Sequence, residues 1–377
     1  MVDNKKNNSQ VVNPFSENHA EIGSDTILAV RDLVVKFKVR DRELTAIRNI
    51  SMDFKKGKVV AIVGESGSGK SVFTKTFTGM LEINGRVDQG EIWFEGKDIA
   101  KYKTDKEWLD IRGNKIATIF QDPMTSLNPV RTIGYQISEV IVKHQKKSKQ
   151  EAKQLAIELM TRVGIPEAEK RYDEYPFMYS GGMRQRIVIA IALACRPKIL
   201  ICDEPTTALD VTIQAQIIAL IKELSEEYDF TTIYITHDLG VVANVADIVA
   251  VMYAGQIIEY GEIEEVFYDP RHPYTWGLLS SLPQLGEKDE DLFAIKGTPP
   301  SLFQEIKGDA FAQRSEYSLK VDFEYEPPMF KVTDTHYAKT WLLDERAPKF
   351  EKPRAIQNLH EKMVALTSKG GIYSDRS

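Results

Sequence analysis

The alternation of apolar and polar positions near the start of the chain predicts antiparallel β-strands. Residues 27–39 and 44–54 alternate in this way on either side of a polar turn at 40–43, and residues 90–99 form another strand-rich stretch. Residues 58–63 differ, because they form a short continuous apolar run that leads into glycine-rich sequence and then a helical stretch. Such runs are typical of parallel strands that are buried on both faces.

The pattern becomes helical from residue 122 to about residue 195, which predicts a helical subdomain. Ser148 and Glu151 have the spacing of a capping box, and four apolar residues follow at helical spacing: Ala152, Leu155, Leu159 and Val163. Gly164 and Pro166 then end this helix.

Three further apolar runs follow the helical subdomain, at residues 199–202, 231–236 and 248–253. Helical segments separate the first two runs and precede the third. This alternation predicts an α/β protein with a parallel sheet wrapped by helices.

The texture of the sequence divides the chain into three parts. Residues 1–25 are polar and show no periodicity, so we expect a disordered tail. Residues 26–262 carry the strand and helix patterns described above and form the expected main domain. Residues 283–335 are rich in Pro, Phe, Glu and Lys with little regular pattern, and we interpret residues 263–377 as an accessory C-terminal domain and tail.

The composition excludes several classes of protein. The 377 residues include 49 Lys and Arg against 55 Asp and Glu, and a net charge of −6 argues against bare nucleic acid as the main partner. The longest apolar run, residues 187–195, is far shorter than the ~20 residues of a membrane-spanning helix, and no apolar stretch near the N-terminus resembles a signal peptide. Cys195 and Cys202 both lie in apolar stretches, which argues against a disulfide scaffold or a zinc module.

Residues 64–71 match the phosphate-loop pattern G-x-x-x-x-G-K-[ST], with a predicted strand before them and a predicted helix after them. Glycines in such a loop turn successive backbone N–H groups toward one anion, and the following helix adds its positive N-terminal end. The lysine reaches the β- and γ-phosphates, and the serine hydroxyl binds Mg²⁺. The predicted ATP-binding residues are Gly64, Glu65, Ser66, Gly67, Ser68, Gly69, Lys70, Ser71 and Val72.

Two acidic residues, Asp203 and Glu204, end the apolar run that begins at residue 199. The carboxyl ends of buried parallel strands lie at the crevice where ligands bind in α/β sheets. We therefore predict that Asp203 holds the Mg²⁺ hydration shell and that Glu204 orients and polarises the attacking water.

Further motifs resemble those of the ATP-binding cassette (ABC) proteins. Residues 179–186, which include Ser180, Gly181 and Gly182, resemble the signature motif that faces the γ-phosphate held by the opposite subunit. The resemblance extends to the Q-loop glutamine at Gln121, the D-loop at residues 208–210 with Asp210, the switch histidine at His237 and the adenine-stacking aromatic residue at Phe37.

The resemblance implies a P-loop fold with a RecA-like parallel sheet core, an antiparallel β subdomain and a helical signature subdomain. It also implies that two cassettes sandwich two ATP molecules and that Glu204, His237 and Lys70 carry the hydrolytic chemistry. The expected Mg²⁺ ligands are Ser71, Gln121 and Asp203.

Residues 120–129 and 261–275 narrow the resemblance to the oligopeptide/dipeptide and nickel importer ATPases. With Met183, the signature motif resembles that of the D-type ATPase subunit, because the F-type sister subunit usually has Gln at this position. The implied assembly lies at the cytoplasmic face of the cell membrane. It pairs this chain with an F-type sister ATPase, two transmembrane permeases and, indirectly, an extracytoplasmic peptide-binding protein.

Residues 308–315 depart from many D-type relatives, which carry cysteines there that can hold an iron–sulfur cluster. This chain has Asp309 and Ser315 at those positions and no cysteine after Cys202. Because such clusters need thiolate ligands, we predict that this chain holds none.

Three alternatives to an oligopeptide importer ATPase stay open at this stage. The chain resembles dipeptide and nickel importer ATPases as well. A soluble ABC ATPase of translation or DNA repair would usually carry two cassettes, a long coiled coil or zinc cysteines, and this sequence has none of these. A P-loop protein that only binds nucleotide would need neither Glu204 nor His237.

Overall fold

The computed structural model describes residues 22–206, 209–281 and 295–353, together with Phe15, Ile356, Gln357 and Leu359. Most of the tail predicted at residues 1–25 therefore lies outside the described residues, as do Ala208 of the D-loop motif and the end of the chain. Phe15 is buried and packs edge-on against the ring of Tyr260.

The described residues form two sheets. The smaller sheet is antiparallel, with the strand order β2-β1-β4-β5, and its strands are β1 (Thr26–Val39), β2 (Arg42–Lys55), β4 (Gly85–Phe94) and β5 (Lys97–Asp98). The prediction of antiparallel strands in this part is confirmed. β4 begins earlier than the apolar pattern indicated, because residues 85–89 pair with β1 although they are largely polar.

The larger sheet has the order β11-β12-β10-β9-β3-β8-β7-β6 and is parallel from β9 to β6. Its strands are β3 (Val59–Val63), β6 (Ile116–Ile119), β7 (Ile199–Asp203), β8 (Thr231–Thr236), β9 (Ile248–Tyr253), β10 (Gln256–Glu262), β11 (Phe330–Lys331) and β12 (Tyr337–Ala338). The four predicted apolar runs correspond to the parallel strands β3, β7, β8 and β9, which confirms the α/β fold class; the pattern did not reveal β6, which also pairs in parallel. β10, β11 and β12 are antiparallel additions that the pattern did not reveal.

The helices fall into three groups along the chain. Those near the phosphate loop and the smaller sheet are α1 (Lys70–Lys75) and α2 (Asp105–Leu109). The helical subdomain contains α3 (Pro123–Ser126), α4 (Ile133–Gln145), α5 (Lys149–Arg162), α6 (Ala168–Arg171) and α7 (Gly181–Leu193). The remaining helices are α8 (Val211–Tyr228), α9 (Leu239–Val245), α10 (Ile263–Tyr268) and α11 (Pro273–Ser280). The capping box of Ser148 and Glu151 is present at the start of α5.

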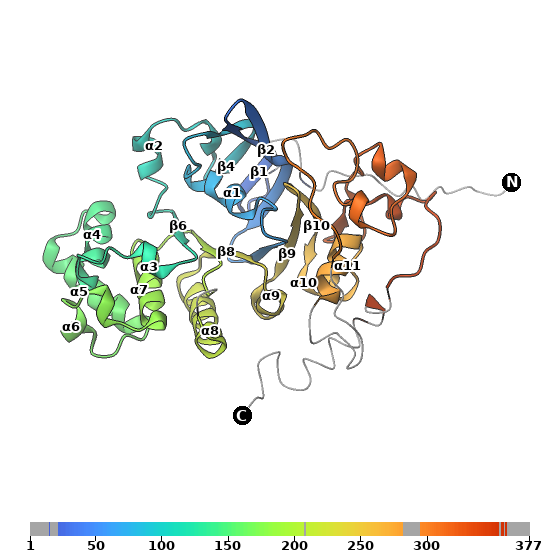
Figure 1. Ribbon diagram of the computed structural model, residues 1–377. Coiled ribbons are helices and arrows are strands. Elements are labelled where there is room, and N and C mark those ends of the chain that lie inside the picture. The colour runs from blue at the N-terminus through green and yellow to red at the C-terminus, as the bar shows by residue number, and fades with distance from the viewer. Residues whose placement is uncertain are drawn as a thin grey trace.

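Helices α4, α5 and α6 lie on one side of the molecule, beyond the β6 edge of the larger sheet (Figure 1). The C-terminal part, which we define as residues 263–281 and 295–353, lies on the other side, next to β10 (Figure 1). Among the residues that the structure describes, no helix combines the length and the hydropathy that a membrane span requires.

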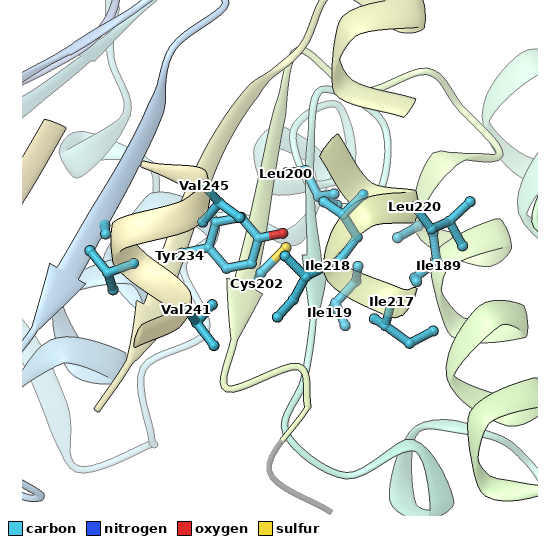
Figure 2. Packing of buried hydrophobic residues seen from close by; sticks show 14 of the residues in the cluster. Ile119, Ile189, Leu200, Cys202, Ile217, Ile218, Leu220, Tyr234, Val241 and Val245 are labelled. Atoms are coloured by element: carbon cyan, nitrogen blue, oxygen red, sulfur yellow. The ribbon is translucent and has the colours of Figure 1, made fainter. Parts of the chain in front are cut away.

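The core between the larger sheet and its helices consists of buried, closely packed apolar side chains. Figure 2 shows Cys202 of β7 and Tyr234 of β8 packed among side chains of α8 and α9. Burial raises the pKa of the Cys202 thiol, so this cysteine acts as a small apolar side chain. Both Cys195 and Cys202 are free thiols, as expected from their apolar surroundings.

Candidate functional site

A cavity of about 590 Å³ lies between the phosphate loop, the smaller sheet and the carboxyl ends of β6 and β7. Ten of the residues predicted from the sequence line it: Phe37, Ser66, Gly67, Gly69, Lys70, Ser71, Val72, Gln121, Asp203 and Glu204. Six further residues that the sequence motifs did not reveal also line it: Val39, Leu44, Ala46, Glu82, Asn84 and Leu302. Val39 and Leu44 lie on the two strands that flank the turn after Phe37, so their closeness to Phe37 in the sequence could have suggested that they line the same cavity.

The backbone of the phosphate loop requires glycine at two positions. Gly69, at the start of α1, has a φ of 104°, which side-chain-bearing residues rarely adopt. Gly64 follows β3 with a φ of 150°, and a Cβ atom there would lie only 2.1 Å from the carbonyl oxygen of Met252. The loop therefore leaves the sheet in close contact with β9.

Lys70 is buried at the base of the loop. Its ammonium group donates to the carbonyl oxygens of Gly64 at 2.8 Å and Glu65 at 2.9 Å. Burial lowers the pKa of Lys70, and the nearby carboxylates of Glu204, Asp203 and Glu65 oppose this shift. The ammonium group of Lys70 is thus held between the loop and the acidic end of β7.

Ser71 and Asp203 lie next to each other. The Ser71 hydroxyl donates to the Asp203 carboxylate at 3.0 Å, and burial raises the pKa of that carboxyl group, with a further contribution from Glu204. A hydroxyl and a carboxylate beside a phosphate site are the hard oxygen ligands that Mg²⁺ prefers. The residues present therefore fit this ion.

Glu204 joins the ends of three neighbouring strands. Its carboxylate accepts from Nε2 of Gln121, which follows β6, at 3.1 Å, and lies 3.2 Å from Nδ1 of His237, which follows β8. Its φ of 48° falls in the sparsely populated left-handed region, and such strain is concentrated at functional sites. The structure thus brings three of the predicted residues into one cluster at the crevice end of the sheet.

The signature residues lie apart from this cluster. Ser180 caps α7 by accepting from the N–H of Met183, and Asp210 caps α8 by accepting from the N–H of Ile213. Gly182 faces Ile213, so the two helix starts pack together. Ser180, Gly181, Gly182 and Asp210 are not among the residues that line the cavity of this chain.

Comparison with solved structures places the fold. The ATP-binding cassette MJ0796, in a dimeric post-hydrolysis state bound to ADP and Pi, matches with a TM-score of 0.56 and 27% identity over 63% of this chain and 98% of that chain. A Clostridium perfringens protein, cbiO1, part of the ABC transporter complex cbiONQ, matches with a TM-score of 0.56 and 32% identity over 65% of this chain and 92% of that chain. The fold and the phosphate site define an ABC-type ATPase.

The sequence comparisons narrow this class. Residues 47–207 match the family model "ABC transporter", and residues 258–320 match "Oligopeptide/dipeptide transporter, C-terminal region". The oligopeptide transport ATP-binding protein AmiE of Streptococcus pneumoniae is 68% identical over 90% of this chain and 96% of its own length. OppD of Bacillus subtilis, also an oligopeptide transport ATP-binding protein, is 57% identical over 90% and 95%. The chain belongs to the family of oligopeptide and dipeptide transport ATP-binding proteins.

Proposed function

We propose that this chain hydrolyses ATP to power the import of oligopeptides through partner permeases. The proposal rests on the cluster of Gln121, Glu204 and His237 beside the Asp203–Ser71 pair. Together these residues supply a metal site and a general base at the carboxyl ends of neighbouring strands. The 68% identity to an oligopeptide transport protein favours oligopeptides over dipeptides and nickel. The match of residues 258–320 to the transporter C-terminal region argues against a soluble ABC ATPase.

The proposed chemistry follows from charge and position. The loop amides and Lys70 bind the β- and γ-phosphates, while the Phe37 ring lies in the cavity wall where it would stack on adenine. In this proposal Glu204 orients and polarises the attacking water. His237, which lies 3.2 Å from Glu204, would contact the γ-phosphate. Mg²⁺ held by Ser71, Asp203 and Gln121 would neutralise phosphate charge.

The signature residues act, in this proposal, on a second cassette. Because Ser180, Gly181 and Gly182 lie outside the cavity of their own chain, they are available at a helix N-terminus to contact nucleotide held by a partner, with Asp210 at the same interface. The match to a dimeric cassette bound to ADP and Pi supports this arrangement. Closure of the two cassettes would then move the permeases as rigid bodies.

The proposed assembly contains an F-type sister ATPase, two permease subunits and an extracytoplasmic peptide-binding protein, with this chain at the cytoplasmic face of the membrane. Within the chain we propose a nucleotide-binding domain at residues 26–262 with a helical subdomain at about 122–195, and an accessory domain and tail at residues 263–377. The matches of residues 47–207 and 258–320 to the two family models support this division. Since Asp309 and Ser315 offer no thiolate, we propose an assembly without an iron–sulfur cluster on this chain.

The test is recovery of the tagged full chain from cell membranes, with identification of the proteins that accompany it. We expect a detergent-sensitive complex with a second ATPase and two permeases. We also expect Lys70→Ala to reduce MgATP binding to this chain strongly, because it removes the charge partner of the phosphates. Recovery with ribosomes or DNA, or unchanged nucleotide affinity in the variant, would contradict the proposal.

A further inference from the structure

Arg314 of the C-terminal part contacts the phosphate loop directly. Nη1 of Arg314 donates to Oε2 of Glu65 at 2.8 Å, and Nη2 donates to Oε1 at 3.0 Å. These are the two parallel bonds of a bidentate pair, which fixes both orientation and distance. The pair joins residues that are 249 positions apart in the sequence.

Arg314 is held on every side. Its side chain is only 5% exposed, and Nε donates to the carbonyl oxygen of Lys296 at 2.9 Å. Nη1 also donates to the Tyr253 hydroxyl at 3.2 Å, and the guanidinium group lies over the rings of Tyr253 and Phe311. A charge pair that is shielded in this way is screened less by solvent and salt than an exposed pair.

Glu65 connects this arginine to the phosphate-binding lysine. Its N–H group donates to the hydroxyl of Tyr274, a buried residue of α11, at 2.7 Å. Its carbonyl oxygen accepts from Nζ of Lys70 at 2.9 Å. The backbone of Glu65 is therefore fixed by the C-terminal part on one side and contacts the Lys70 ammonium group on the other.

We propose that Arg314 and Tyr274 are positioning residues of the nucleotide site. They set the conformation of the first residues of the phosphate loop and thereby the position of the Lys70 ammonium group. The inference rests on the proposed nucleotide-binding role of that loop. Neither residue lines the cavity, so both act through Glu65. By reciprocity, nucleotide binding would in turn hold the C-terminal part more firmly on the cassette.

The competing explanation is that the Arg314–Glu65 pair only attaches the C-terminal part to the rest of the chain. Another ion pair offers a matched control, because Arg48 of β2 donates to Glu326 of the C-terminal part at 3.2 Å. Glu326 also accepts from Gln256 and Lys339, and none of its contacts involves residues 64–71. Weakened attachment alone would make Glu326→Gln and Arg314→Ala behave alike.

The experiment measures the dissociation constant of MgATP on the full chain, and KM and kcat in the assembled transporter. We expect Arg314→Ala to raise the dissociation constant and KM about tenfold. We expect a smaller change in kcat, because saturating nucleotide compensates for a displaced loop. Arg314→Lys should restore part of the loss, since it keeps the charge but not the fork. Glu326→Gln should bind MgATP like the wild type.

Two further variants keep the inference testable if Arg314→Ala does not fold. Tyr274→Phe removes only the hydroxyl that accepts from Glu65, and we expect it to weaken MgATP binding about three- to tenfold. The double variant that combines Arg314→Lys with Glu65→Gln should bind MgATP no more weakly than the weaker-binding of the two single variants, because both substitutions break the same contact.

The outcomes separate this inference from the proposed function. If the wild type binds MgATP, Lys70→Ala does not, and Arg314→Lys and Tyr274→Phe bind like the wild type, only the positioning role is overturned. The same conclusion follows if Glu326→Gln and Arg314→Ala weaken binding equally. If the wild type and Lys70→Ala bind MgATP equally, the nucleotide-binding role of the loop itself is overturned.

Discussion

Substitution of Glu204 by Gln separates nucleotide binding from hydrolysis. The two side chains have the same length, and the amide oxygen of the glutamine can still accept from Gln121 at 3.1 Å, while its NH2 group takes the place of the oxygen that lies 3.2 Å from Nδ1 of His237 and donates to that nitrogen in the tautomer that leaves it unprotonated. The backbone is equally strained in both, since neither residue relieves a φ of 48°. The change therefore removes one negative charge and the proton-accepting carboxylate, and it turns one hydrogen-bond acceptor into a donor.

The magnitude follows from these two losses. Removal of a general base lowers the rate by about 10²- to 10⁴-fold, which corresponds to about 3–5 kcal/mol of transition-state stabilisation. The lost negative charge stands close to Lys70 and Asp203, as the pKa shifts of both groups indicate. Its removal reduces repulsion of the γ-phosphate, so we expect MgATP to bind with equal or higher affinity.

The assay is ATP turnover by the assembled transporter, together with MgATP binding, for Glu204→Gln and Lys70→Ala side by side. The lysine variant reports how much of the total rate depends on the site that this chain's phosphate loop builds. If Lys70→Ala lowers the rate and Glu204→Gln leaves it near the wild-type value, Glu204 is not the base. Weakened binding in the glutamine variant would contradict the electrostatic argument.

Three further outcomes are expected. Phe37→Ala should weaken MgATP binding about 5- to 100-fold through lost stacking, whereas Phe37→Tyr should not; equal affinity for both would place Phe37 in packing alone. Glu259→Ala should lower the free energy of unfolding in urea by about 3–5 kcal/mol, because the buried carboxylate accepts from the N–H groups of Arg271 and His272 and pairs with His336; a change below about 1 kcal/mol would contradict this. Burial raises the pKa of Asp322 to about 6, so the folded chain binds its proton more tightly than the unfolded chain, and the free energy of unfolding should fall by on the order of 2 kcal/mol as the pH rises from 3.8 to about 6. Asp322→Asn should flatten that decline, and an unchanged slope would refute the assignment.

The positions of most residues that line the site were predictable from the sequence, because local patterns mark them. A phosphate loop has its glycines, lysine and serine at fixed positions of one short segment, and Asp203 and Glu204 stand at the end of the buried strand β7 and directly after it. Gln121 and His237 follow β6 and β8 in the same way, so parallel pairing alone brings them to one edge. The roles of these residues stay predictions until the variants are measured.

The contribution of the C-terminal part was not predictable. Leu302 enters the cavity wall because its carbonyl oxygen accepts from the N–H of Thr45 at 3.1 Å, a contact that no local pattern announces. β11 and β12 contain two residues each, too few for periodicity to appear. The sequence analysis gave Arg314 no role, because its partner Glu65 lies 249 positions earlier in the sequence.

The pairing of β12 with β10 has a consequence for how this chain tolerates shortening. Glu259 and Tyr260 of β10 pair with Ala338 and Tyr337, and the N–H of Lys339 donates to the carbonyl oxygen of Ile258 at 2.8 Å. A chain that ends before β11 would expose the unpaired backbone groups of β10 at the edge of the larger sheet. Such an exposed edge is a template for strand pairing between molecules. Truncation there is expected to yield aggregates rather than a smaller working ATPase.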